Sequence, residues 1–283
     1  MELEVISVLG AGTMGHGIAQ VAAMADYRVF LYDIKPEFVA RGLENIRKNL
    51  DKGVEKGKVT AQARDRALAN ITTTVELAQA AQAAELVIEA VPETLDLKRE
   101  VFRELDRYCS ANTILATNTS SLSVAEIAAA TNRPSQVVGM HFFNPVHIMK
   151  LLEVVHSQET APETVATAVA VGRRIGKEPI VVRDSPGFAS SRLGIALGLE
   201  AIRMLEQGVA SAEDIDKAME LGYNHPMGPL KLTDLVGLDV RLSIADYLHT
   251  TLGSEVFRAP EILRRNVAEG KLGKKSGEGF YKW

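Results

Sequence analysis

The sequence lacks the features that mark secreted and membrane-spanning proteins. Its only cysteine, Cys109, cannot form an intramolecular disulfide, which is consistent with a reducing cytoplasm. No apolar stretch approaches the ~20 residues that span a bilayer. The first residues also lack the basic region and apolar core of a secretion signal. We therefore expect a cytoplasmic protein with no membrane partner.

Charge and metal-ligand spacing argue against two further classes. The formal net charge is -4, so the chain has no general basic surface for nucleic acid. The six histidines show no HxxxH spacing and a CxxC pair is impossible, so we expect no metal site. What remains is a globular chain of 283 residues, 46% of them hydrophobic, which is long enough for two domains.

The N-terminal segment has the order of elements that a dinucleotide site needs. An apolar run over 3–9 leads into Gly10-Ala11-Gly12-Thr13-Met14-Gly15, a helix-favouring run follows over 16–25, and a second apolar run ends at Asp33. Glycines here allow a sharp turn, close approach of a pyrophosphate and close packing of helix on strand. Asp33 would accept hydrogen bonds from ribose hydroxyls and repel a 2′-phosphate, which favours NAD over NADP. The alternative is a tight strand–helix turn without a ligand.

Strands alternate with helices in the first two thirds of the chain. We predict strands over 85–91, 113–118, 137–140, 151–155 and 179–182, with helices between most of them. This alternation predicts an α/β fold, with a Rossmann-type, mostly parallel sheet in a domain over 1–183. Residues 184–283 show only helical patterns and predict a second, all-helical domain.

One helix of the first domain is rich in lysine and arginine. Apolar residues recur every three to four positions over 38–58, while the other faces carry Arg47, Lys48, Lys52, Lys56 and Lys58. These charges form either a solvated face or a patch for a phosphorylated carrier such as coenzyme A.

Polar clusters follow three predicted strands, at 92–93, 118–121 and 141–144. Ligands bind at the carboxyl ends of strands in open α/β sheets. Alone, His141 could be a core histidine bonded to a carbonyl. However, Glu153 lies on the next strand, and a hairpin-like return would bring its carboxylate beside the imidazole. A histidine held in this way is a base for removing a hydroxyl proton as hydride leaves, so the residues predict NAD-dependent alcohol dehydrogenation.

An ordered set of motifs over the whole chain resembles the 3-hydroxyacyl-CoA dehydrogenase family, most closely its short 3-hydroxybutyryl-CoA dehydrogenases. Besides residues 10–15, the motifs are Asn118-Thr119-Ser120-Ser121-Leu122, His141-Phe142-Phe143-Asn144-Pro145, Met149-Lys150-Leu151-Leu152-Glu153-Val154, Asp184-Ser185-Pro186-Gly187-Phe188, Pro226-Met227-Gly228-Pro229 and Gly277-Glu278-Gly279-Phe280-Tyr281.

The resemblance implies NAD-dependent oxidation of (3S)-3-hydroxyacyl-CoA, and the reverse reduction, on short chains such as 3-hydroxybutyryl and acetoacetyl. It implies His141 and Glu153 as the catalytic pair and Ser120 as the residue that bonds the substrate's 3-oxygen. The helical domain is implied to form a homodimer interface and to close over the acyl-CoA substrate. The implied NAD contacts are Gly10, Ala11, Gly12, Thr13, Met14, Gly15, Asp33, Glu93, Lys98, Ser120, Asn144 and Lys275.

The coenzyme A region of the family falls on the basic helix, where Lys52 and Asn45 are the candidate substrate contacts. One position departs from the family pattern, because many members have Asn where this chain has Ser191. A serine hydroxyl can still donate to a substrate oxygen, directly or through a water, so Ser191 is a candidate catalytic residue.

Two rival functions stay open. The first is a dehydrogenase on the same scaffold that acts on a free hydroxy acid, such as a sugar acid or carnitine. The second is a non-catalytic NAD-binding or structural protein, against which the presence of Ser120, His141 and Glu153 argues.

Overall fold

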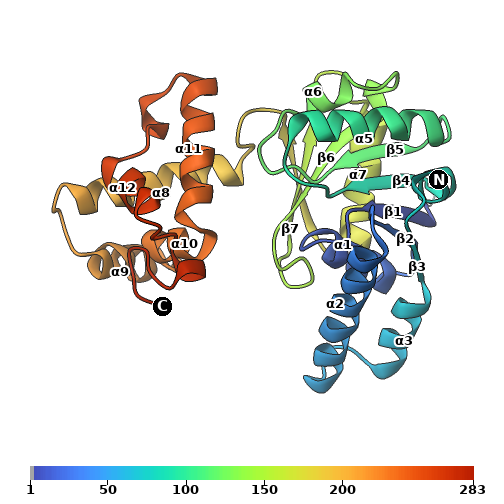
Figure 1. The fold of residues 1–283 in the computed structure, drawn as a ribbon, viewed down its shortest axis with the longest axis horizontal. Coiled ribbons are helices and arrows are strands. Elements are labelled where there is room, and N and C mark those ends of the chain that lie inside the picture. Colours follow the sequence, from blue (N-terminus) through green and yellow to red (C-terminus); the bar gives the residue numbers. More distant parts are fainter. Residues whose placement is uncertain (1–2) are drawn as a thin grey trace. The chain divides into compact units, whose positions relative to one another are not determined.

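The computed structural model describes residues 3–283 and divides into two compact units (Figure 1). The first unit ends at Ser185, and the second is Pro186–Trp283, which begins two residues beyond the predicted boundary. Within residues 3–283, no helix has both the length and the apolar character needed to cross a membrane.

The first unit is built on one eight-stranded sheet with the strand order β3-β2-β1-β4-β5-β6-β7-β8. Neighbouring strands are parallel, except that β6 and β7 are antiparallel. This confirms the predicted mostly parallel, Rossmann-type sheet, and the first six strands have the 3-2-1-4-5-6 order of dinucleotide-binding folds. The strands are β1 (Val5–Leu9), β2 (Arg28–Tyr32), β3 (Ile71–Thr74), β4 (Leu86–Glu89), β5 (Ile114–Thr117), β6 (Val137–Phe142), β7 (Leu151–His156) and β8 (Glu178–Arg183).

Helices flank this sheet and bury its centre. Every residue of β1, β4, β5 and β6 is buried, as expected for strands that are covered on both faces. The helices of this unit are α1 (Gly15–Met24), α2 (Pro36–Glu55), α3 (Ala61–Ala69), α4 (Leu77–Ala83), α5 (Leu95–Tyr108), α6 (Val124–Ala128) and α7 (Pro162–Arg174). The sequence prediction lacked α3, β3 and α4; of these, β3 is an Ile-Thr-Thr-Thr segment without an apolar run.

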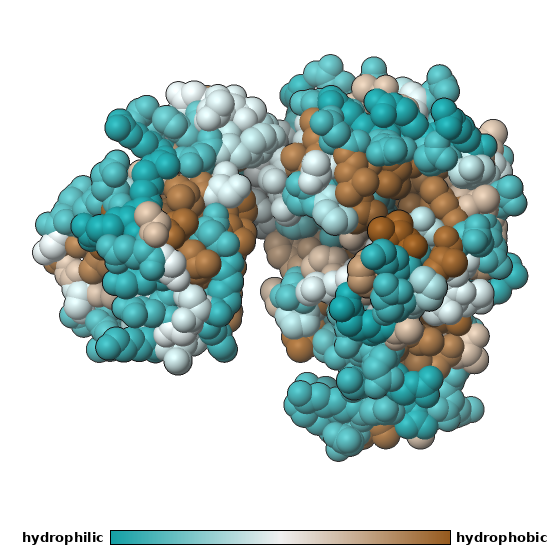
Figure 2. All heavy atoms as spheres, viewed as in Figure 1, coloured by the Kyte–Doolittle hydropathy of each residue, from teal (hydrophilic) through white to brown (hydrophobic). Residues whose placement is uncertain are grey.

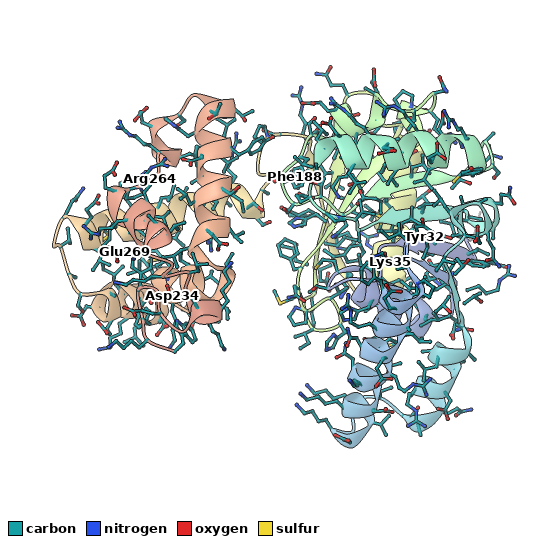
Figure 3. The ribbon with its side chains drawn as sticks, in the orientation of Figure 1. Tyr32, Lys35, Phe188, Asp234, Arg264 and Glu269 are labelled. Atoms are coloured by element: carbon teal, nitrogen blue, oxygen red, sulfur yellow. The ribbon has the colours of Figure 1, made fainter. Side chains whose placement is uncertain are left out.

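The second unit is helical, which confirms the prediction for this part of the chain. Its helices are α8 (Ser190–Glu206), α9 (Ala212–Gly222), α10 (Pro229–Val236), α11 (Leu238–Leu252) and α12 (Glu261–Ala268). The buried carboxylate of Asp234, labelled in Figure 3, fixes the C-terminal tail to α10. It accepts hydrogen bonds from the N–H groups of Phe280 (2.8 Å) and Tyr281 (2.9 Å) and from the indole of Trp283 (2.9 Å).

Candidate active site

The turn between β1 and α1 leaves room for a phosphate beside its backbone. Gly10 has a φ of +92°, and a Cβ there would lie 2.6 Å from the carbonyl oxygen of Ala90, so glycine is required. A Cβ at Gly15 would collide with the carbonyl of Gly10. At Gly12, however, no atom of any described residue beyond its two chain neighbours lies within 4 Å of the Cβ position. This space adjoins the N-terminus of α1, where unpaired N–H groups favour an anion.

Asp33, which follows β2, is tied to the same turn. Its Oδ2 accepts a hydrogen bond from the N–H of Ala11 at 2.8 Å, and its Oδ1 accepts one from the N–H of Ile34 at 2.8 Å. The N–H of Gly10 also donates to the carbonyl of Tyr32 at 2.8 Å, where β2 ends (Figure 3). Each carboxylate oxygen keeps a second lone pair that could accept from a ribose hydroxyl. The turn, the helix N-terminus and this carboxylate together fit a dinucleotide.

His141 on β6 and Glu153 on β7 form a buried pair. The antiparallel register places the two residues directly opposite each other, and Nδ1 of His141 lies 2.7 Å from Oε2 of Glu153. His141 is 6% exposed and Glu153 is fully buried. The contact expected from the hairpin-like return of the chain is therefore present. A carboxylate at Nδ1 favours the tautomer with the proton on Nδ1, which leaves Nε2 as the acceptor.

A chain of buried charges connects the end of β4 with Ser120. The fully buried carboxylate of Glu89 accepts hydrogen bonds from Nζ of Lys98 at 2.7 Å and from the hydroxyl of Thr117 at 2.8 Å. Nζ of Lys98 lies 3.3 Å from Oε2 of Glu93. Oε1 of Glu93 then accepts from the N–H of Ser120 at 2.8 Å and from its hydroxyl at 3.1 Å.

Burial raises the pKa of both Glu89 and Glu93, whereas the charge of Lys98 lowers it. Burial raises the pKa of Glu89, and the charge of Lys98 only partly offsets that effect. At Glu93, burial is outweighed by Lys98 and by hydrogen bonds from Thr119 and Ser120, so its pKa lies below the usual value. Glu93 and Lys98 are both predicted NAD contacts. The side chain of Glu93 is 39% exposed, whereas that of Lys98 is 1% exposed.

Two asparagines lie near the same sheet edge. Oδ1 of Asn118, which follows β5, accepts a hydrogen bond from the N–H of Phe142 at 2.9 Å. This bond joins the end of β5 to the strand that carries His141. Asn144, a predicted NAD contact, is exposed in the loop that follows β6.

A cavity of about 810 Å³ lies between the ends of α1 and α2 and the loop that joins β6 to β7. Its lining contains no aspartate or glutamate among the described residues, so it is strongly positive. Of the two candidate coenzyme A contacts, Lys52 lies in the wall of this cavity, whereas Asn45 is half-buried outside it, and both roles stay predictions. The cationic side chains are Lys52, Lys56, Lys58, Lys150, Arg174 and Lys177.

Two basic residues shape this cavity from the loop side. Lys177 is buried and donates to the main-chain carbonyls of Val146 and, at 2.8 Å, of Met149. It therefore fixes the loop between the strands of His141 and Glu153. His147 lies in that loop, and burial, helped by nearby positive groups, lowers its pKa below the usual value. The neighbouring positive or titratable groups are His16, Lys177 and Lys52.

Two predicted site residues belong to the second unit. Ser191 lies in the first turn of α8 and is half-buried. Lys275 forms an ion pair with Asp239, with Nζ 2.7 Å from Oδ2. Their predicted substrate and NAD contacts remain predictions.

Sequence reasoning overlooked Glu89 and the loop residues of the cavity. Glu89 could have been found from the sequence, because it is an acidic residue at the end of an apolar run and lies nine residues before Lys98. For His147 and Lys177 there was no such signal, because they meet only through the fold. Among residues 3–283, no cluster of three or more His, Cys, Asp or Glu side chains could hold a metal.

Two family models match nearly the whole chain. The model described as 3-hydroxyacyl-CoA dehydrogenase, NAD binding domain, matches residues 5–185. The model described as 3-hydroxyacyl-CoA dehydrogenase, C-terminal domain, matches residues 187–283.

Individual relatives are similar over nine tenths or more of their length. A probable 3-hydroxybutyryl-CoA dehydrogenase of Bacillus subtilis strain 168 is 47% identical over 281 residues, which cover 99% of this chain and 98% of that protein. The mitochondrial hydroxyacyl-coenzyme A dehydrogenase of Homo sapiens is 41% identical, over 98% of this chain and 90% of that protein. The crystal structure of (S)-3-hydroxybutyryl-CoA dehydrogenase from Ralstonia eutropha has a TM-score of 0.97 and 39% identity, with coverage of 100% and 99%.

Proposed function

Because the chain belongs to the 3-hydroxyacyl-CoA dehydrogenase family, we propose that it interconverts (3S)-3-hydroxyacyl-CoA and 3-oxoacyl-CoA on short acyl chains. The enzyme is an NAD-dependent dehydrogenase. The observation that supports its chemistry is the 2.7 Å contact of His141 with Glu153. The two residues lie in the sheet whose strand β1 leads into the turn that fits a dinucleotide.

His141 is the proposed acid–base group. NAD, when bound, accepts the hydride in oxidation, and NADH donates it in reduction. In oxidation, Nε2 of His141 removes the proton of the 3-hydroxyl group. In reduction, the imidazolium protonates the alkoxide. The carboxylate of Glu153 fixes the ring and stabilises the positive charge that the ring acquires.

Ser120 is the proposed contact of the substrate's 3-oxygen. Its N–H and hydroxyl groups are both held by Glu93, which is fixed in turn by Lys98. The N–H bond to Glu93 holds the backbone of the serine in place, and the hydroxyl exchanges its own bond to Glu93 for one to the 3-oxygen when the substrate binds.

The positive cavity is the proposed site for the phosphates of coenzyme A. Six lysine and arginine side chains line it, so a carrier with several phosphate charges would be bound mainly by electrostatic attraction. This supports an acyl-CoA substrate over a free hydroxy acid, which has no such group.

The second unit is the proposed homodimer interface. Apolar side chains of three of its helices reach the surface, where Leu193 of α8 is 71% exposed, Leu235 of α10 46% and Val240 of α11 40%. Figure 2 shows apolar residues, in brown, at the surface of this unit. Light scattering should give twice the 30.7 kDa chain mass. Leu235→Asp should shift it toward the monomer, and a monomeric wild type would contradict the interface.

The comparison of acetoacetyl-CoA with free acetoacetate tests the proposed function. Both offer the same 3-oxo group, and only the first carries the nucleotide. We expect rapid loss of NADH absorbance with acetoacetyl-CoA and little with acetoacetate. Equal rates would favour the free-acid rival, and no reaction with either would favour a non-catalytic NAD-binding protein.

A further inference from the structure

The helical unit contains a buried guanidinium without a described partner. Arg241 is 8% exposed and lies on the buried face of α11 with Leu238, Ala245 and Leu248. Its Nε has no hydrogen-bond partner among residues 3–283, and no carboxylate of those residues forms an ion pair with it. Burial lowers the pKa of Arg241 to about 10, so the group is still charged at neutral pH. An uncompensated buried charge is strongly unfavourable, which points to an anionic partner from outside these residues.

Helix α8 leaves space for this guanidinium beside Ser191. Nη1 of Arg241 lies 3.5 Å from the Cβ position of Gly194 and 4.0 Å from that of Gly198, one turn further along. A larger side chain at either glycine would compete for this space. Ser191 is three residues before Gly194, hence on the same helix face, about 4.5 Å earlier along the axis. The next residue, Arg192, also has a buried Nε without a described partner.

We propose that Arg241 binds the terminal carboxylate of the acyl chain, so that the enzyme prefers dicarboxylic acyl-CoA substrates. The inference rests on the proposed function, because it takes Ser191 to face the acyl chain near the 3-oxygen. A guanidinium can hold a carboxylate through two parallel hydrogen bonds, which gives both affinity and orientation. Leu238 and Ala245, three residues before and four residues after Arg241, lie on the same buried face of α11, so the helix surface beside the guanidinium is apolar.

A pair of substrates of equal length tests this assignment. The chain of 3-oxoadipyl-CoA ends in a carboxylate, and the equally long chain of 3-oxohexanoyl-CoA ends in a methyl group. The readout is the ratio of their kcat/KM values in wild type, Arg241→Met and Arg265→Met. Arg265 is an exposed arginine of α12 and serves as the matched control. Methionine keeps much of the side-chain length without the charge.

We expect the wild type to favour 3-oxoadipyl-CoA and Arg241→Met to lower the ratio about tenfold to a hundredfold, mainly through KM for 3-oxoadipyl-CoA. The control should keep the wild-type ratio. If Arg241→Met does not fold, Arg241→Lys should lower the ratio about three- to tenfold, because lysine lacks the fork geometry.

Three results would overturn the inference. One is turnover of 3-oxohexanoyl-CoA without any wild-type preference for 3-oxoadipyl-CoA. Another is an Arg241 variant with the wild-type ratio of the two kcat/KM values. If that variant also dissociates an oligomer, the guanidinium pairs with a second copy of the chain instead of the substrate. The last is no turnover of either thioester, which would remove the proposed function itself.

Discussion

Nδ1 of His141 lies 2.7 Å from Oε2 of Glu153, and the antiparallel register of β6 and β7 holds the two residues directly opposite each other. The pair occurs where β6 and β7 run antiparallel, whereas the other neighbouring strands within residues 3–283 are parallel. Because the strand direction reverses there, residues twelve apart in sequence become neighbours in a buried environment. The geometry of the proposed acid–base group therefore depends on this reversal.

His141→Ala should lower kcat about 10²- to 10⁴-fold, the usual effect of losing a general acid–base group. The affinity for NADH should change little, which separates chemistry from cofactor binding. Glu153→Gln should keep the packing and lose the charge that supports the imidazolium, so its kcat should also fall. His156→Ala is the control, since this histidine at the end of β7 bonds a main-chain carbonyl. Wild-type kcat in either pair variant would refute the proposed pair.

Asp33 should make the enzyme prefer NADH to NADPH, because its carboxylate faces the site expected for the ribose 2′ position. Asp33→Asn keeps an oxygen that can accept from the N–H of Ala11 but removes the repulsion of a 2′-phosphate. The ratio of kcat/KM for the two cofactors should narrow by about tenfold, or ~1.4 kcal/mol. Equal use of both cofactors by the wild type would show that Asp33 does not select NAD.

Lys52→Ala should raise KM for acetoacetyl-CoA about two- to fivefold, the range for one exposed charge pair. KM for a truncated acetoacetyl thioester without the nucleotide should not change. Lys48→Ala is the matched control, because Lys48 lies on the same helix and pairs with Glu44. Equal effects of Lys52→Ala on both substrates would argue against a carrier role for this lysine.

His147 should make binding of coenzyme A depend on pH. Its pKa is lowered from 6.5, so it is neutral at pH 7 and gains charge only as the pH falls through this lower value. In the free enzyme, burial and repulsion from His16, Lys177 and Lys52 disfavour the charged form. The contribution of His147 to the free energy of unfolding is therefore fully present above pH 6.5 and is lost as the pH falls through the lower pKa. A bound phosphate would relieve this repulsion.

Titration calorimetry from neutral to mildly acidic pH can measure this linkage. Relative to His147→Gln, the wild type should gain affinity for coenzyme A as the pH falls. Protonation of the phosphates of coenzyme A affects the affinity of both proteins equally, so it does not contribute to the difference between them. Parallel pH profiles would show that His147 does not face the carrier.

Removing one member of the buried pair of Glu89 with Lys98 should lower the free energy of unfolding more than removing both members. Glu89→Gln leaves a buried ammonium with one of its two carboxylates and should cost about 3–5 kcal/mol of stability, the range for a broken buried ion pair. The double variant Glu89→Gln with Lys98→Met should recover much of that loss in denaturant unfolding. Equal destabilisation of the single and double variants would contradict the charge argument.

Sequence patterns predicted the parts of the molecule that depend on local order. The glycine turn and Asp33 are recognisable because each residue has a separate steric or electrostatic requirement at a fixed spacing. The strands that end at Glu89, Thr117 and Phe142 are apolar runs, which become buried strands in a doubly covered sheet.

Other features arise only when distant segments meet. Lys177 lies thirty-one residues from Val146, and nothing at either position shows that an ammonium will bond that carbonyl. Arg241 has the sequence context of an ordinary polar residue of a helix, yet it is buried and lies against two glycines of α8. β3 was missed because Thr72 and Thr73 are exposed and the strand has no apolar run.

Oxidation of the two enantiomers of 3-hydroxybutyryl-CoA with NAD tests the proposed reaction and its acid–base group together. We expect NADH to accumulate with the (3S) substrate and not with the (3R) substrate, and His141→Ala to lose the (3S) activity. A comparable rate with both enantiomers, or a His141→Ala enzyme as fast as the wild type, would show that the proposed stereochemistry or the proposed acid–base group is wrong.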